Sequence, residues 1–165
     1  MSVPAGFLET ERIYFRQFQD TDAQDFWAVR LRDSNLFIGW FHPRPDKISE
    51  GETEPGYRFQ WNVRGCGLAT EGSKVLLDQA FNEWGYQKVC ARTMAINPAW
   101  RRVMEKAGLR FEPEFHDEMD VAHGWIEESE RRAAKYSITR AGYCAARRGT
   151  AEKLNFPAKK RRTEG

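Results

Sequence analysis

Asn62-Val63-Arg64-Gly65-Cys66-Gly67-Leu68-Ala69-Thr70-Glu71-Gly72 is the stretch that carries most information about the fold. Two glycines, one residue apart, lead here directly into a long amphipathic run. Glycine allows backbone N–H groups to approach a phosphate closely, and the start of a helix carries the positive end of the helix dipole. The stretch therefore predicts an anion-binding loop at the N-terminus of a helix.

Two common phosphate-binding motifs do not fit this loop. The dinucleotide fingerprint requires G-x-G-x-x-G and an acidic residue about 20 positions later, and the P-loop requires G-x-x-x-x-G-K-[ST]. In this chain Leu68-Ala69-Thr70 follows Gly67, and no Gly-Lys-Ser or Gly-Lys-Thr occurs. The loop must therefore belong to another class of phosphate site.

Arg64-Gly65-Cys66-Gly67-Leu68-Ala69 matches the pattern [Arg/Gln]-x-x-Gly-x-[Gly/Ala]. This is the pyrophosphate loop of the GNAT superfamily of N-acetyltransferases, which the chain resembles over most of residues 7–143. Residues 8–18, 37–41, 54–58 and 103–109 resemble, in that order, the first, third and fourth strands and the fourth helix of the branch that acetylates the N-termini of ribosomal proteins.

The resemblance implies an α/β (α+β) fold, with a mixed, mostly antiparallel sheet flanked by helices and shortened near the N-terminus. Hydrophobic periodicity agrees, because Leu77, Ala80, Phe81 and Trp84 follow i, i+3, i+4 and i+7 and predict a helix over residues 68–84. Further helices are predicted at 20–26 and 98–107, and strands at 12–18, 27–31, 36–41, 56–61, 89–94, 109–115 and 135–139, with a hairpin turn at 33–35.

Composition indicates one domain. A chain of 165 residues with 41% hydrophobic residues can bury one core. No apolar run approaches the ~20 residues of a membrane span, and the first residues lack a signal-peptide pattern, so we expect a cytoplasmic protein. The 3 cysteines lack C-x-x-C spacing, which indicates neither a disulfide framework nor a metal site.

Charge is distributed unevenly along the chain. From residue 145 onward seven basic residues face two acidic ones, a net charge of +5, which leaves −3 for residues 1–144. We therefore expect a GNAT-like domain at 1–143 and a basic, disordered tail at 144–165. A solvated terminus is the simpler interpretation of the tail, and nucleic-acid contact through it is disfavoured because the body has no basic stripe.

The resemblance implies acetyl-CoA as the co-substrate and a primary amine as the acceptor, on a protein N-terminus or a small molecule. It assigns coenzyme contacts to Arg64, Gly65, Cys66, Gly67, Leu68, Ala69, Thr70 and Asn97. Asn97 before Pro98 also predicts a helix N-cap, and the two roles are compatible. The implied mechanism is direct attack of the amine in a ternary complex.

Glu54 matches the place of the family carboxylate that draws a proton from the acceptor amine. The alternative is a solvated acid, because residues 49–54 contain three glutamates. His116 resembles another family position, but a histidine in an acidic loop is more simply a surface residue. Cys66 has no adjacent histidine that could activate it as a nucleophile.

The chain departs from the family in two respects. Trp100 replaces a serine, and Met104 stands where other branches carry a tyrosine, so no obvious general acid remains. In addition, residues 22–26 and 27–29 abut, whereas the family separates such segments by its first two helices. The sequence therefore keeps the part of the family's fold that binds the coenzyme and lacks much of the part that binds the acceptor amine.

Two hypotheses follow from these departures. The first is a working acetyl-CoA-dependent N-acetyltransferase with an open acceptor side. The second is a catalytically weak or inactive member that binds acetyl-CoA or a partner, in which Trp27, Phe37, Trp40 and Phe41 form an exposed apolar patch. The second hypothesis also leaves a homodimer open.

Overall fold

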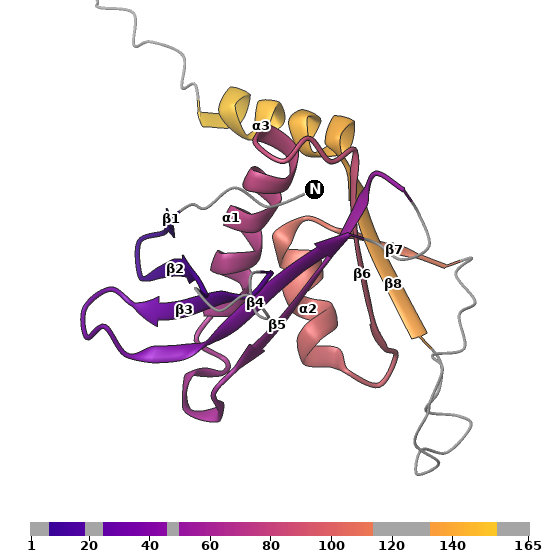
Figure 1. Cartoon of the computed structure of the whole chain (residues 1–165). Coiled ribbons are helices and arrows are strands. Elements are labelled where there is room, and N and C mark those ends of the chain that lie inside the picture. The colour runs from indigo at the N-terminus through magenta and orange to yellow at the C-terminus, as the bar shows by residue number, and fades with distance from the viewer. Residues whose placement is uncertain (1–6, 19–24, 46–49, 114–132, 155–165) are drawn as a thin grey trace, which may run out of the picture.

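The computed structural model of the chain describes residues 7–18, 25–45, 50–113 and 133–154. Five strands come first, and helices then separate most of the later strands (Figure 1). In chain order they are β1 (Phe7–Glu9), β2 (Ile13–Gln17), β3 (Trp27–Leu31), β4 (Phe37–Pro45), β5 (Glu52–Phe59), α1 (Leu68–Asn82), β6 (Lys88–Met94), α2 (Pro98–Ala107), β7 (Arg110–Glu112), β8 (Ala133–Thr139) and α3 (Arg140–Leu154).

These strands form one 8-stranded sheet in the order β1-β2-β3-β4-β5-β6-β8-β7. Neighbouring strands are antiparallel except β5 and β6, which run parallel. The predicted mixed, mostly antiparallel sheet flanked by helices is therefore confirmed. The hairpin predicted at 33–35 is confirmed as well, since β3 and β4 pair around Asn35, which has a left-handed φ of 58°.

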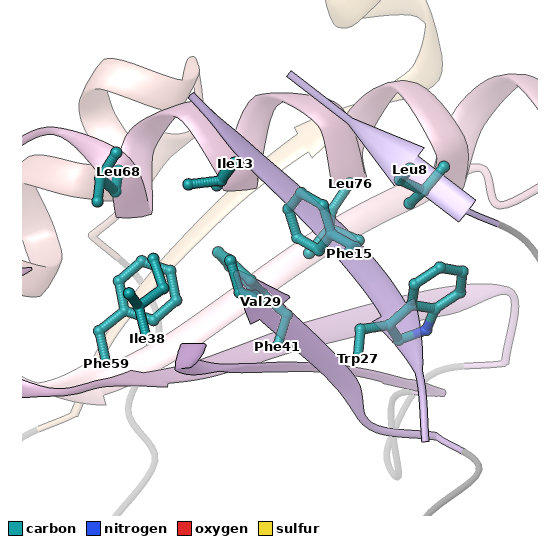
Figure 2. Packing of buried hydrophobic residues seen from close by; sticks show 10 residues of the cluster. All are labelled: Leu8, Ile13, Phe15, Trp27, Val29, Ile38, Phe41, Phe59, Leu68 and Leu76. Carbon is teal, nitrogen blue, oxygen red and sulfur yellow. The ribbon is translucent and has the colours of Figure 1, made fainter. Parts of the chain in front are cut away.

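Strand alternation builds the first half of the core (Figure 2). In β2 and β3 every second residue is buried, so that Ile13, Phe15, Trp27 and Val29 are at most 1% exposed. Phe15, together with Phe41 of β4, meets α1 at Gly72, where an added Cβ would lie only 2.6 Å from Cε2 of Phe41 and 3.1 Å from Cζ of Phe15. A glycine is therefore needed for this close approach of helix to sheet.

The expected exposed patch is wrong for two of its four residues. Trp27 and Phe41 are buried in this core, at 1% and 0% exposure, because they lie on the side of the sheet that α1 covers. Phe37 and Trp40 are partly exposed. Only these two remain as candidates for a surface role.

The second half of the core joins α1 and α2 to β6 and β8. Its buried members are Leu77, Ala80, Phe81, Val89, Ala91, Met104, Ala107, Leu109, Ala134 and Tyr136. The ring of Phe81 on α1 also meets Tyr143 on α3, with centroids 5.0 Å apart. Helices α1 and α2 therefore pack against the same face of the sheet, and α3 packs against α1.

An opening in the sheet follows from the short pairing of β5 and β6. The two strands pair only at Glu52–Lys88 and Thr53–Val89, although β5 continues to Phe59 and β6 to Met94. Beyond these pairs the strands separate. Tyr57, on the diverging part of β5, packs against both halves of the core.

Several predicted bounds need correction. β5 begins at Glu52 rather than at residue 56, because β4 extends to Pro45 and pairs with this segment, and Trp61 lies in a 3₁₀ turn, Trp61–Val63. Within the described part of the strand predicted at 109–115, only β7 is observed. The predicted helix at 20–26 falls mostly outside the described residues, and His116 lies outside them altogether.

The prediction of a disordered tail from residue 144 is wrong for residues 144–154, which belong to α3. This helix is anchored at Tyr143, whose hydroxyl donates a hydrogen bond to Asp78 Oδ1 on α1 at 2.7 Å. Residues 155–165 lie outside the described part, and the domain boundary at 143 stays a prediction. Within the described residues, no helix is both long enough and apolar enough to cross a membrane.

Candidate functional site

The predicted anion-binding loop precedes α1. Gly65 and Gly67 adopt left-handed φ values of 77° and 81°, which side-chain-bearing residues adopt at a cost. Gly67 is the N-cap of α1, and no side chain caps this helix. The N–H groups of a first helical turn lack intrahelical acceptors, so those of residues 68–70 are available to an anion.

A cavity of about 420 Å³ lies between this loop, β5 and α2. Its lining residues are Tyr57, Arg58, Phe59, Val63, Arg64, Gly65, Gly67, Leu68, Ala69, Thr70, Asn97, Ala99, Trp100, Arg102, Val103 and Lys106. Four of them are basic and none is acidic. The cavity is thus suited to an anionic ligand.

Helix α2 supplies one wall of the cavity. Asn97 is its N-cap, since Oδ1 accepts a hydrogen bond from the N–H of Trp100 at 3.1 Å, and Pro98 occupies the first helical position. The predicted cap is therefore confirmed. Arg102 and Lys106 are four residues apart, on one side of the helix, and both line the cavity.

The turn between β1 and β2 supports the loop. Arg12 Nη1 donates to the carbonyl of Cys66 at 3.0 Å, while its Nε and Nη2 bind Glu71 Oε2 at 2.7 Å. The backbone N–H of Arg12 and the hydroxyl of Thr10 donate to Glu71 Oε1. Burial raises the pKa of Glu71, but these hydrogen bonds and the charge of Arg12 outweigh it and leave the pKa below its usual value.

The lowered pKa makes this support of the loop sensitive to acid. A carboxyl group whose pKa is lower in the folded state stabilises the fold above its unfolded pKa, and this contribution is lost as pH falls through the folded pKa. We expect the free energy of unfolding of a Glu71→Gln variant to fall less than that of the unchanged protein from about pH 6 to about pH 3. Urea denaturation across this range measures it, and parallel curves for the two proteins would contradict the assignment.

Tyr57 and Trp100 bring two aromatic rings into the cavity lining. The rings are nearly parallel, at 5°, with centroids 6.5 Å apart. Burial raises the pKa of Tyr57 to about 12, although the charge of Arg64 acts in the opposite direction. Its phenol therefore stays protonated near neutral pH and can donate a hydrogen bond to a bound molecule.

Glu54 lies at the point where β5 and β6 separate. Its Oε1 accepts a hydrogen bond from the N–H of Arg92 at 3.2 Å, and its Oε2 lies 3.3 Å from both Arg44 Nη2 and Arg92 Nη1. Its side chain is 15% exposed and is not among the cavity-lining residues. The carboxylate thus joins β4, β5 and β6 rather than standing free in solvent.

The structure brings most of the predicted coenzyme residues together. Arg64, Gly65, Gly67, Leu68, Ala69, Thr70 and Asn97 line one cavity. Cys66 does not, because its thiol is exposed and its carbonyl binds Arg12. Among the described residues, no group of three or more His, Cys, Asp or Glu side chains could hold a metal ion.

The sequence interpretation missed nine of the cavity residues, among them the polar or aromatic Tyr57, Arg58, Trp100, Arg102 and Lys106. Two of these carried a readable signal. Arg102 and Lys106 fall at i and i+4 of the predicted helix 98–107, so a shared basic side of that helix could have been found from spacing. Arg58 and Tyr57 required the strand register.

Comparison with known proteins gives the same family. Residues 7–110 match the family model of the acetyltransferase (GNAT) domain. Over 111 residues the chain is 37% identical to FsC-acetyl coenzyme A-N(2)-transacetylase of Aspergillus fumigatus, covering 63% of this chain and 46% of that protein. It is 28% identical over 129 residues to the uncharacterized N-acetyltransferase YnaD of Bacillus subtilis, covering 76% and 74%. The chain spans about half the length of the fungal relative.

Solved structures show the same fold. An acetyltransferase (GNAT family) from Bacillus anthracis superposes with a TM-score of 0.68 at 20% identity, covering 82% of this chain and 99% of that one. A GCN5-related N-acetyltransferase from Brucella melitensis gives 0.70 at 16% identity, covering 92% and 86%. Since the family model matches well over half of the sequence, the chain belongs to the GNAT acetyltransferase family.

Proposed function

We propose that this chain transfers an acetyl group from acetyl-CoA to a primary amine by direct attack in a ternary complex. The observation that carries the proposal is the acid-free cavity, in which helix-start N–H groups and four basic side chains converge. Acetyl-CoA presents a pyrophosphate, a further phosphate and a slender arm, and this set of groups suits such a lining. The fungal relative is named an acetyl coenzyme A transacetylase, which supports the same chemistry.

Each part of the cavity has a proposed role. The amides of residues 65–70 hold the pyrophosphate, and Arg102 and Lys106 hold further phosphate charge. Asn97, Tyr57 and Trp100 lie along the arm. Binding energy from these remote groups orients the thioester for attack.

In the transfer step, the amine nitrogen bonds to the acetyl carbon and the carbon–sulfur bond breaks. The amine loses one proton and the departing thiolate gains one, so the net proton balance is zero. Glu54 is the proposed proton acceptor, because it lies where β5 and β6 open. Because its carboxylate oxygens already contact Arg44 and Arg92, we propose that a water molecule carries the proton from the amine to Glu54.

The proposal is tested by measuring acetyl-CoA binding by calorimetry and free-thiol release with a panel of primary amines and N-terminal peptides. Binding together with amine-dependent thiol release is the expected result. Binding without release from any amine would indicate an inactive member of the family. The absence of binding would contradict the cavity assignment itself.

Glu54→Gln tests the proton acceptor separately. We expect kcat to fall by about 10- to 100-fold, because general base catalysis commonly contributes at least this much. A matched Glu52→Gln variant removes a neighbouring carboxylate that pairs with Lys88 and should keep kcat near that of the unchanged protein. If Glu54→Gln lowers only the free energy of unfolding, then Glu54 holds the strands together and is not the base.

A further inference from the structure

One face of the sheet carries no helix in the described part of the chain. Helices α1 and α2 pack against the face that presents Phe15, Val29 and Phe41, and α3 packs against α1. Successive side chains of a strand point to opposite faces. Residues 14, 16, 28, 30, 40, 42 and 58 therefore lie on the opposite face, which is outside the core.

A row of four residues crosses this outer face. Arg16 pairs with Ala28, Ala28 with Trp40, and Trp40 with Arg58. Directly paired residues share a face, and neighbouring strands are ~4.8 Å apart, so the row spans about 14 Å. An arginine stands at each end, with a methyl group and an indole between them.

The two arginines are available to a ligand. Both are exposed. Neither forms a hydrogen bond or an ion pair with any other described residue, in contrast to Arg44 and Arg92, which hold Glu54. A guanidinium group without a carboxylate partner attracts a carboxylate or another planar anion.

Aromatic rings border the row. Phe26 stacks on His42, with centroids 4.1 Å apart and planes at 9°, and meets Trp40 edge-on at 5.0 Å. These three rings are only partly exposed, so their orientation is fixed by mutual packing. They give the row an aromatic border for the apolar part of a bound molecule.

The row also reaches the coenzyme cavity. Arg58 lines this cavity, and Glu54 lies on the same strand and the same face, four residues earlier. At ~3.3 Å per residue, the two positions are about 13 Å apart. A molecule whose anion binds Arg58 can therefore extend its other end toward Glu54 and the opening between β5 and β6.

We propose that Arg16, Phe26, Trp40, His42 and Arg58 form the acceptor-binding surface, and that the acceptor is an amine carrying a carboxylate several bonds away from the reactive nitrogen. The proposal rests on the acetyltransferase function proposed above. Guanidinium groups that pair with no other described residue attract the carboxylate, whereas they repel a second ammonium group. A carboxylate-bearing amine is therefore preferred over a neutral amine, and a neutral amine over a diamine.

Three amines of equal length test this order: 6-aminohexanoate, hexylamine and 1,6-diaminohexane. At saturating acetyl-CoA we expect kcat/KM for 6-aminohexanoate to exceed that for hexylamine by about tenfold, the effect of ~1.4 kcal/mol, with the diamine lowest. The preference should shrink as salt rises, because the arginines are exposed. Equal or higher kcat/KM for hexylamine or the diamine would overturn the proposal.

Variants locate the effect on the surface. Arg16→Gln lies outside the coenzyme cavity and should reduce the ratio of kcat/KM for 6-aminohexanoate to that for hexylamine at least about threefold. Arg110→Gln removes another exposed arginine, on β7 at the far edge of the sheet, and should leave the ratio unchanged. A ratio unaffected by Arg16→Gln, or equally reduced by Arg110→Gln, would refute the assignment.

A binding measurement separates this proposal from the catalytic one. Saturation-transfer NMR of 6-aminohexanoate, with the protein and CoA present, detects binding of the amine even without turnover. We expect a signal that weakens in Arg16→Gln and not in Arg110→Gln. Such a signal without thiol release would support the acceptor-binding surface and contradict the proposed catalysis. Turnover of amines without a preference for the carboxylate would support the catalysis and contradict the acceptor-binding surface.

Discussion

Gly67→Asp is expected to weaken acetyl-CoA binding by at least about 100-fold, or ~2.7 kcal/mol. Gly67 is the N-cap of α1, at a φ of 81°, and it lines the cavity between the loop and the helix. An aspartate there places a negative charge at the site proposed for the pyrophosphate. It also takes over helix-start N–H groups, because aspartate is a favoured N-cap.

The control for this variant is Gly51→Asp. Gly51 has the same φ of 81°, and no atom lies within 4 Å of an added Cβ. This variant therefore reproduces the backbone strain and the charge away from the cavity. Calorimetry should give coenzyme affinity near that of the unchanged protein for Gly51→Asp. Equal losses in the two variants would attribute the effect to strain alone.

A counter-effect at Gly67 comes from Arg12. Its Nη2 lies 3.5 Å from the Cβ that the substitution adds, so it can pair with the new carboxylate. Such a pair would neutralise part of the new charge, but it would draw Arg12 away from Glu71. A neutral Gly67→Asn variant separates the two effects, because it keeps the cap and the strain without the charge. We expect its affinity to lie between those of Gly67→Asp and the unchanged protein.

Local signals explain what the sequence could predict. The bounds of α2 were predicted correctly because both ends are encoded nearby, by Asn97 and Pro98 at the start and by Gly108, with a φ of 104°, at the end. The glycine pattern of the loop placed residues 65 and 67 in the cavity for the same reason. Each of these features depends on a few neighbouring residues.

Long-range pairing explains what the sequence could not predict. Glu54 was expected to lie just before a strand starting at residue 56, but pairing with β4 places it in a strand between Arg44 and Arg92, 10 and 38 residues away. The face of the sheet that α1 covers likewise decides which aromatic residues are buried. Trp27 and Phe41 lie on that face, whereas Phe37 and Trp40 remain partly exposed. Residues 144–154 were misjudged from their charge, although three alanines between 141 and 146 favour a helix.

Reversing two charges on α2, with Arg102→Glu and Lys106→Glu together, is expected to weaken acetyl-CoA binding by about 100-fold or more. Both side chains line the cavity, and both are exposed, so each single reversal should cost about tenfold, near the effect of an exposed charge on a phosphate. In the proposed complex they hold phosphate charge beyond the reach of the loop amides. The loss should therefore be smaller for a pantetheine thioester, which lacks those phosphates.

Calorimetry of acetyl-CoA at several salt concentrations checks this prediction. The unchanged protein should bind more weakly as salt rises, and the double variant should show a flatter dependence, because fewer ionic contacts remain to be screened. Lys74→Glu with Arg110→Glu produces the same change in net charge at exposed sites outside the cavity lining. If that control loses as much affinity as the α2 variant, then the coenzyme responds to the overall charge of the protein, and the basic side of α2 is not a phosphate site.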